Sequence, residues 1–306
     1  MTDHLPKENC YAPLCKYDDT WYPSYLIPGV VASKQLFKAE EGDIILASLP
    51  KSGTTWLKAL TFSIVNRNRF KPQDSPLLTT QPHDLVLGLE FEHFRDGVPQ
   101  NLDQPSRPRI FATHVSHASL SDSIKASNNC RIVYVCRNPL DNFMSYWHFF
   151  SSSKSQYIQG ETIEELFVKY CKGVHPYCPF WSHNLEYWKA SLEKPEKVLF
   201  LTYEDLKEDT VSQLKRLALF LGFPFTEEEE AQGLVEEISM VCSLGNLKSL
   251  EVNQNGVRDH GMPVSSYFRK GEVGDYINHL TPSMVETLNK LTHEKFAGSG
   301  LVFKSK

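Results

Sequence analysis

The chain has 306 residues, of which 41% are apolar and 23% charged, which is ordinary globular usage. Its net charge of −5 argues against a nucleic-acid-binding surface as its main function. No apolar run approaches the ~18 residues that cross a bilayer, and residues 1–9 do not resemble a signal peptide. The seven cysteines form no Cys-x-x-Cys pair. We therefore expect a cytoplasmic protein with reduced thiols, no membrane contact and no structural zinc.

Strands and helices alternate along most of the chain. Residues 1–40 are aromatic and irregular, and we expect them to form a surface segment around the core. Short apolar runs predict buried strands at residues 43–49, 109–113, 131–136 and 197–202. Helical spacing predicts helices at residues 54–66, 139–150, 162–172, 179–192 and 209–221. The alternation predicts one α/β domain over residues 41–306, with a central, mostly parallel β-sheet covered by helices on both faces.

Three further segments have a local signature. Thr226 and Glu229 have the spacing of a capping box at the start of a helix. Residues 70–108 contain many proline, aspartate and glutamine residues and are predicted to be mostly loop. Residues 245–268 are polar and rich in turn formers. A loop of that length in a compact domain is usually a lid or disordered, and the sequence leaves both alternatives open.

A phosphate-binding loop is predicted between the first buried strand and its helix, at Pro50–Trp56. The backbone N–H groups of residues 52–55 are unpaired at the helix start, where the dipole also favours an anion. Gly53 lets the backbone approach phosphate oxygens closely. The groups that add charge or hydroxyl donors are the side chains of Lys51, Thr54 and Thr55.

The sequence of this loop allows two other interpretations. It could be an ordinary strand–turn–helix corner capped by Ser52. It could also belong to an ATP-dependent enzyme, but the Walker A motif places its lysine after the second glycine. Here Lys51 precedes Gly53, and residues 46–50 lack the first glycine. The loop is therefore P-loop-like without being a Walker A loop.

A second anion site is predicted at the end of the third buried strand. Arg137 follows that strand, at the carboxyl edge where open α/β sheets bind ligands. Its guanidinium could fork onto a phosphate, and Ser145 lies two turns into the next helix. Alternatively, Arg137 could pair with Asp141. Two anion sites on neighbouring strand ends suit a nucleotide with phosphates at two separate positions.

These residues resemble the cytosolic sulfotransferase family, in particular its plant branch. The blocks that carry the resemblance are Leu49–Trp56, Thr113–His114, Cys136–Phe149, Tyr203–Asp205 and Phe268–Gly271. The resemblance implies transfer of a sulfuryl group from 3′-phosphoadenosine 5′-phosphosulfate (PAPS) to an acceptor hydroxyl. PAPS would be the co-substrate, adenosine 3′,5′-bisphosphate the product, and no metal would take part.

The resemblance also implies a role for each matching residue. The 5′-phosphosulfate would be held by Lys51, Ser52, Gly53, Thr54 and Thr55. Adenine and its ribose would be contacted by Trp56, Tyr203, Ser243 and Leu244. The 3′-phosphate would be held by Arg137, Ser145, Arg269, Lys270 and Gly271. The catalytic residues would be His114, as the general base, and Lys51.

The chain departs from the family at several positions. Ala112 stands where animal members often have a lysine, and Leu244 stands where phenylalanine is common. Both departures would affect affinity rather than the reaction. Many animal members dimerise through a segment that reads Lys-x-x-x-Thr-Val-x-x-x-Glu. Here Ile277 replaces the lysine and Pro282 the valine, so we expect a monomer.

Sulfuryl transfer, like phosphoryl transfer, needs in-line alignment, a base for the acceptor and positive charge at the leaving group. A neutral histidine suits the role of base. His117 competes with His114 for it, since either could follow the second buried strand. Their His-x-x-His spacing also suggests a metal, but no nearby carboxylate completes such a site. His148 is expected to be structural.

The acceptor is expected to be a small lipophilic or phenolic compound, such as a flavonoid, a steroid or a hydroxyjasmonate. Aromatic residues that could line its pocket, or belong to the core, are Trp21, Tyr22, Phe91, Phe94, Trp147 and Phe150. Two other functions remain open. The chain could be a small-molecule kinase with Val198–Asp205 as its Walker B strand, or a non-catalytic protein that binds PAPS or adenosine bisphosphate.

Overall fold

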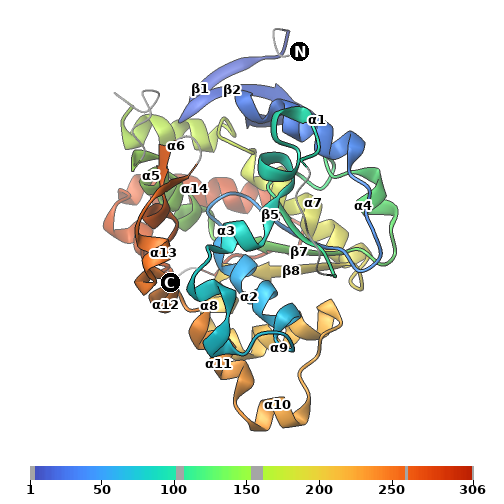
Figure 1. The fold of residues 1–306 in the computed structure, drawn as a ribbon. Helices are drawn as coiled ribbons and strands as arrows, with labels where there is room; N and C mark the ends of the chain where they lie inside the picture. Colours follow the sequence, from blue (N-terminus) through green and yellow to red (C-terminus); the bar gives the residue numbers. More distant parts are fainter. Residues whose placement is uncertain (1–3, 101–106, 153–160, 259–260, 305–306) are drawn as a thin grey trace.

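The structure, a computed structural model, describes residues 4–100, 107–152, 161–258 and 261–304. At its centre lies a five-stranded parallel sheet (Figure 1). Its strands, in spatial order, are β5 (Leu87–Gly88), β6 (Ile110–Thr113), β4 (Ile44–Ser48), β7 (Arg131–Cys136) and β8 (Val198–Thr202). Because β4 lies in the middle, the loop after it is flanked by the ends of β6 and β7.

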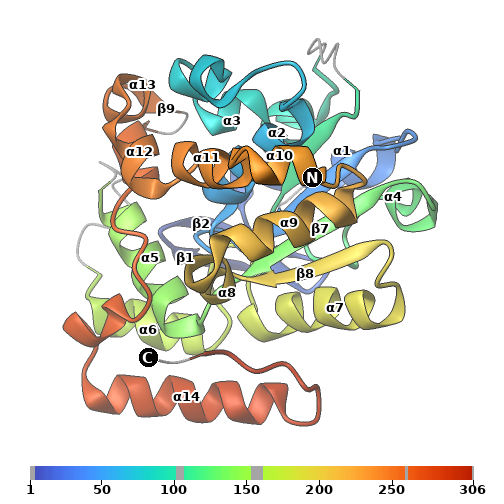
Figure 2. The same cartoon turned by 90° about the horizontal axis from the view of Figure 1, so that it is seen from below.

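Helices cover both faces of this sheet. On one face Ile44 and Leu46 pack with the apolar sides of α2 (Thr54–Asn66) and α9 (Thr210–Leu221). On the other face Ile45 and Ala47 belong to the cluster that includes α5 (Pro139–Ser151) and α7 (Phe180–Glu193). Figure 2 shows α2 and α9 on one side of the strands and α7 on the other. Strands buried on both faces are continuously apolar, which is why they were recognisable. The predicted fold class is confirmed.

The predicted helices agree with the observed ones to within two residues at each end. The remaining helices are α1 (Ile27–Leu36), α3 (Pro82–Leu85), α4 (Asp122–Ala126), α6 (Ile163–Cys171), α8 (Tyr203–Glu208), α10 (Glu227–Ala231), α11 (Leu234–Val241), α12 (Leu244–Ser249), α13 (Glu251–Gln254) and α14 (Pro282–Phe296). The capping box is confirmed, since Thr226 and Glu229 each accept the other's backbone N–H.

The N-terminal stretch is not irregular, contrary to the prediction. Residues 7–23 form an antiparallel sheet of β1 (Lys7–Cys10), β2 (Ala12–Tyr17) and β3 (Thr20–Pro23), followed by α1. The turn between β2 and β3 has two residues of positive φ, Asp18 and Asp19, as two-residue hairpins require. Asp-Asp is a weak signal for such a turn. Side chains of this sheet belong to the main hydrophobic core. The division of the chain into a surface segment, residues 1–40, and a domain, residues 41–306, stays a prediction.

The two segments predicted to be loops also hold regular structure. Residues 70–100 include α3, the edge strand β5 and a π-helical turn at Leu89–His93. Residues 245–268 contain most of α12, all of α13 and the short pair β9 (Val257–Arg258) and β10 (Met262–Pro263), with residues 259–260 outside the described part. Leu247 and Asn253 are buried there, and the Asn253 amide donates to the Leu247 carbonyl over 2.9 Å. The segment is therefore packed, and its role as a lid stays untested.

Candidate active site

The predicted phosphate loop joins the end of β4 to α2. Gly53 is the N-cap residue of α2, with a φ of 116°, and no side chain caps the helix. The backbone N–H groups of its first turn are therefore open to an anion. A Cβ on Gly53 would lie 2.8 Å from Cδ2 of Tyr203, so the loop needs glycine. Ser52 is buried and accepts a hydrogen bond from Asn142 over 3.1 Å, so Ser52 is not the cap.

The two threonine hydroxyls of the loop have different surroundings. Thr54 Oγ1 lies 2.6 Å from Ser48 Oγ at the end of β4, which fixes that side chain against the sheet. Thr55 Oγ1 lies 3.0 Å from Nε2 of His83, a residue of α3. Only the Thr55 side chain is partly exposed, so it is the better placed of the two to reach a ligand.

Lys51 has the electrostatics of an anion-binding group. Its φ of 67° places it in the left-handed region, and Nζ lies 3.7 Å from the centre of the Phe149 ring. Desolvation, together with the charges of Arg137 and Arg269, lowers the pKa of Lys51 to about 7. Within the described part of the chain, no carboxylate forms an ion pair with Lys51. The binding of a phosphate would therefore reduce the electrostatic repulsion among Lys51, Arg137 and Arg269.

His114 follows β6 and has the tautomer of a base. Its Nδ1 lies 2.8 Å from the Ser48 carbonyl oxygen, which can only accept, so Nδ1 carries the proton. Nε2 then has a free lone pair, and no described residue forms a hydrogen bond with Nε2. The ring lies edge-on to Phe91 and Tyr177, at centroid distances of 5.4 and 5.3 Å. Burial lowers the pKa of His114 to about 3, which keeps the imidazole neutral at pH 7.

A buried carboxyl group fixes the backbone that carries this histidine. Glu90, in the π-helical turn, accepts hydrogen bonds from the His114 N–H (2.8 Å), the Thr113 hydroxyl (2.8 Å) and the Tyr177 hydroxyl (3.3 Å). Burial raises its pKa to about 7. No motif or spacing singles out Glu90 in a stretch predicted to be loop, so sequence reasoning missed it.

His117, the competing candidate for the base, lies in a different environment. Its ring packs edge-on against Tyr187 at 5.4 Å, and burial lowers its pKa to about 4. None of its contacts within the described residues is with the phosphate loop. The two histidines of the His-x-x-His pair thus contact different residues.

The second predicted anion site lies around Arg137 at the end of β7. Its guanidinium lies over the Tyr203 ring at 4.5 Å and donates to the Glu272 carbonyl over 2.7 Å. Nε of Arg137 is buried without a partner in the described part of the chain. Asp141 instead accepts the N–H groups of Gly274 and Tyr276, so the alternative Arg137–Asp141 pair is wrong.

Other predicted nucleotide-binding residues gather around Tyr203. Its hydroxyl donates to the Gly271 carbonyl over 2.9 Å, and the Trp56 ring lies edge-on to Tyr203 at 5.6 Å. A Cβ on Gly271 would lie 2.3 Å from Cδ2 of Leu244, so these two residues are in contact. Ser243 caps α12 by accepting the N–H of Asn246 over 3.2 Å. Together with Arg137, the structure brings residues from four of the five sequence blocks into one region around Tyr203.

Arg269 and Lys270 are both paired with Asp275, at 2.6 and 2.9 Å. Burial alone would raise the pKa of Asp275, but these two hydrogen bonds outweigh burial and hold the pKa well below its usual range. His148 and His279 lie beside Asp275, with ligand atoms of the three residues within 4.8 Å of one another, the arrangement of a candidate metal site. Because Arg269 and Lys270 already use the carboxylate, this corner favours an anion. Ser145 is half-buried on α5, one turn before His148.

Glu204 and Asp205, which a kinase would use to hold Mg²⁺, have structural partners. Glu204 accepts the N–H of Asn138 over 2.9 Å, and Asp205 forms an ion pair with Lys304 at 2.7 Å. This arrangement argues against a Walker B strand.

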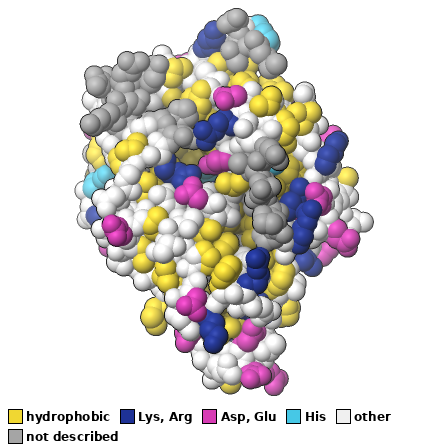
Figure 3. Space-filling view, viewed as in Figure 1, with side chains coloured by type: hydrophobic (Ala, Val, Ile, Leu, Met, Phe, Trp, Pro, Cys, Tyr) yellow, Lys and Arg dark blue, Asp and Glu magenta, His cyan; other side chains and the backbone are white. Residues whose placement is uncertain are grey.

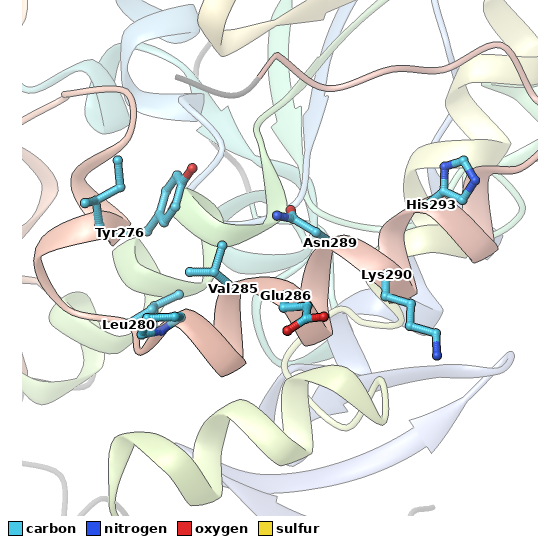
Figure 4. Close-up of a pocket in the computed structure, with 9 residues that line it drawn as sticks. Tyr276, Leu280, Val285, Glu286, Asn289, Lys290 and His293 are labelled. Carbon is cyan, nitrogen blue, oxygen red and sulfur yellow. The ribbon is translucent and has the colours of Figure 1, made fainter.

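A groove and the charge distribution of the surface can be compared with the predicted site residues. An open groove of about 890 Å³ lies along α14 and the segment before it, and it is lined by none of the predicted site residues (Figure 4). On the face seen in Figure 3, lysine and arginine side chains are dispersed among acidic ones. Among the described residues, no helix has the length and apolar character needed to span a bilayer.

Comparison with known proteins agrees with this geometry. Residues 41–300 match the family described as sulfotransferase domain. Cytosolic sulfotransferases 15 and 14 of Arabidopsis thaliana are 45% and 46% identical, each over 99% of this chain and over 86% and 90% of their own lengths. A putative steroid sulphotransferase of the same plant has a TM-score of 0.77 at 37% identity, covering 99% of this chain and 94% of its own. Mouse sulfotransferase SULT7A1, complexed with PAP, has a TM-score of 0.68 at 26% identity, covering 94% and 95%. The chain therefore belongs to the cytosolic sulfotransferase family and is a PAPS-dependent sulfotransferase.

Proposed function

We propose that this chain transfers the sulfuryl group of PAPS to a hydroxyl of a small lipophilic or phenolic acceptor, with His114 as the general base. The observation that carries the proposal is the hydrogen bond from His114 Nδ1 to the Ser48 carbonyl. It leaves Nε2 as the only basic atom of the ring, at the edge of the sheet where the phosphate loop begins. A protein that only binds a nucleotide has no use for such a base.

Several features fit PAPS to this region. Gly53 and Gly271 stand where a Cβ would collide with neighbouring side chains. Lys51 has no ion-pair partner in the described structure, and Nε of Arg137 is buried without one. We infer that Lys51 and residues 52–55 hold the 5′-phosphosulfate, and that Arg137, Ser145 and Arg269–Gly271 hold the 3′-phosphate. Trp56, Tyr203, Ser243 and Leu244 would then surround the adenosine.

In the proposed reaction, Nε2 of His114 takes the proton of the acceptor hydroxyl as its oxygen bonds to sulfur. The bond from sulfur to the bridging oxygen breaks, and adenosine 3′,5′-bisphosphate leaves. Negative charge grows on the 5′-phosphate during this step, and Lys51 and the open N–H groups of α2 stabilise that charge. Because a loose, in-line transfer requires little covalent work from the protein, positioning and electrostatics suffice.

The acceptor side is proposed to be apolar. Phe91 and Tyr177 lie against the His114 ring, so an acceptor that reaches Nε2 must pass aromatic surface. Of the six aromatic residues predicted for this role, Tyr22 and Phe94 are fully buried in the core, whereas Phe91 is half-buried beside the base. A panel of flavonoids, steroids, hydroxyjasmonates and simple phenols, assayed with labelled PAPS, would identify the acceptor class.

Substitution of the base tests the proposal most directly. His114→Ala should lower kcat at least ~10²-fold, the scale of lost general-base catalysis, with little change in the Kd for PAPS. His117→Ala is the matched control and should keep normal turnover. If His117→Ala is inactive and His114→Ala is not, the assignment of the base is wrong.

The two remaining alternatives are separated by simple assays. A kinase would lose turnover in EDTA, whereas the proposed transfer should persist because positive side chains replace Mg²⁺. A non-catalytic binding protein would bind adenosine 3′,5′-bisphosphate and show no transfer to any member of the acceptor panel.

A further inference from the structure

Lys58 is a buried cation with a sparse set of partners. It lies on α2, is 4% exposed and forms no ion pair within the described residues. Its Nζ lies 3.1 Å from Nδ1 of His83. The nearby carboxyl groups of Glu92, Glu90 and Asp84 favour the charged ammonium, whereas burial and Arg258 oppose it, and burial has the largest effect. A buried ammonium whose only direct partner is an imidazole is costly, so packing alone does not account for it. Thr55 and Lys58 are three residues apart and therefore lie on the same face of α2.

His83 connects Lys58 to the phosphate loop. It comes from α3, which packs against α2 (Figure 1), and its ring lies 4.6 Å from that of Tyr267. Its Nδ1 faces Lys58, and its Nε2 lies 3.0 Å from Thr55 Oγ1. The three side chains thus form an unbroken chain of hydrogen bonds that ends at the loop.

The donors of this chain can be assigned from its chemistry. An ammonium group can only donate, so Lys58 donates to Nδ1 and the proton of the neutral imidazole lies on Nε2. Burial lowers the pKa of Lys58 to about 8, which leaves the amine charged at pH 7, and lowers that of His83 well below its usual range. Nε2 then donates to Thr55 Oγ1. The hydroxyl proton of Thr55 is left without an acceptor among the described residues.

We propose that Lys58 and His83 are positioning residues that turn the Thr55 hydroxyl proton toward the 5′-phosphosulfate. In the reverse arrangement Thr55 would donate to His83, which would require Lys58 to accept a hydrogen bond. The pair therefore fixes Thr55 as a donor to the ligand and places a second positive charge behind the loop. This inference rests on the proposed function, in which residues 52–55 hold the 5′-phosphosulfate.

The test compares two nucleotides that differ only in the 5′-phosphate. Affinities for adenosine 3′,5′-bisphosphate and adenosine 3′-monophosphate are measured by calorimetry at pH 7, with the weaker ligand in displacement format. Lys58→Met and His83→Phe should each weaken binding of the bisphosphate ~10-fold, the value of one hydrogen bond to a charged group. Binding of the monophosphate should stay unchanged. Thr55→Val should have the same effect, and Thr55→Ser should restore tight binding.

A double-mutant cycle separates positioning from structural damage. If Lys58 acts through Thr55, adding Lys58→Met to Thr55→Val should cause little further loss. Lys197 is a matched control, since it is a buried lysine bonded to three backbone carbonyls. Lys197→Met should lower Tm without changing the ratio of the two affinities.

The possible outcomes distinguish the inference from the proposed function. If the wild type binds both nucleotides equally, the proposed role of the loop is wrong. If the wild type prefers the bisphosphate and Lys58→Met keeps that preference in full, only the positioning role is overturned. Full additivity of Lys58→Met and Thr55→Val would also overturn it.

Discussion

At the residue scale, the protonation states of Lys51 and His114 define the pH range of the proposed reaction. The pKa of His114 is about 3, so Nε2 stays unprotonated throughout the neutral range. The pKa of Lys51 is about 7, so its positive charge is lost as the pH rises through that value. In the folded protein, His114 therefore does not titrate near the usual histidine pKa of about 6.5. Lys51 titrates near neutral pH instead.

The pH dependence of kcat/KM for PAPS should reflect Lys51. It should fall as the pH rises above 7, approaching ~10-fold per pH unit, because kcat/KM reports the free enzyme. An aliphatic alcohol as acceptor avoids ionisation of the acceptor itself. Lys51→Arg keeps its charge and should lack the fall between pH 7 and 8. The state of His114 is checked instead by kcat at saturating PAPS and acceptor, and a decline of kcat below pH 6.5 would contradict it.

Glu90 gives a separate prediction about stability. Its pKa is about 7 in the folded chain and 4.5 as the reference value, so the folded state favours the protonated form. The contribution is fully present below pH 4.5 and is lost as the pH rises through 7, on the order of 3 kcal/mol. Urea unfolding at pH 5 and pH 7.5 should show the wild type losing more stability than Glu90→Gln, which cannot ionise. Parallel losses in both proteins would refute the buried, proton-binding state of Glu90.

At the element scale, the ends of two neighbouring strands are proposed to bind different phosphate groups of the nucleotide. The end of β4 leads into the loop proposed to hold the reacting phosphosulfate. The end of β7 carries Arg137, proposed to hold a phosphate that undergoes no chemistry. Interactions that are equally strong in the ground state and transition state affect binding, whereas those that strengthen in the transition state affect turnover.

Arg137→Ala should therefore weaken binding of PAPS and of adenosine 3′,5′-bisphosphate, by roughly 2–3 kcal/mol for a lost charged hydrogen-bond partner. Turnover at saturating PAPS should change little. Lys51→Ala is the contrasting variant and should mainly lower kcat. Calorimetry with donors that carry or lack the 3′-phosphate checks the assignment. Equal wild-type affinity for the two donors would be incompatible with it.

The elements that were predictable from the sequence are those with local signals. The buried strands are continuous apolar runs, and Lys51–Trp56 follows one of them in a recognisable order. The hairpin of β2 and β3 was missed because Asp18-Asp19 lacks the glycine usual in such turns. Glu90 and His83 were missed because their roles depend on partners 24 and 28 residues away in the chain. Neither pairing leaves a periodic pattern that could be recognised in a single sequence.

At the scale of the whole molecule, the residues at and before the start of α14 bear on whether two copies of the chain can associate. Thr281 caps this helix by accepting the N–H of Met284, and Pro282 is its first residue. Ile277 is 61% exposed, and Ile277, Pro282 and Glu286 line the open groove of Figure 4. These positions correspond to the segment through which many animal relatives dimerise. Here the surface offers neither the lysine at the first position nor a backbone N–H at the sixth, where Pro282 stands.

We expect the protein to be a monomer, because proline cannot donate a backbone hydrogen bond across a two-fold contact and its φ is fixed near −65°. Light scattering at micromolar concentration should give a mass near 35.0 kDa. The double variant Ile277→Lys, Pro282→Val restores the two missing residues and should shift the mass upward if this segment is the only obstacle. Arg216→Lys, on the exposed side of α9, is a control that should not shift it. A stable wild-type species of twice the monomer mass would show that the chain pairs through another surface, and the expectation would be wrong.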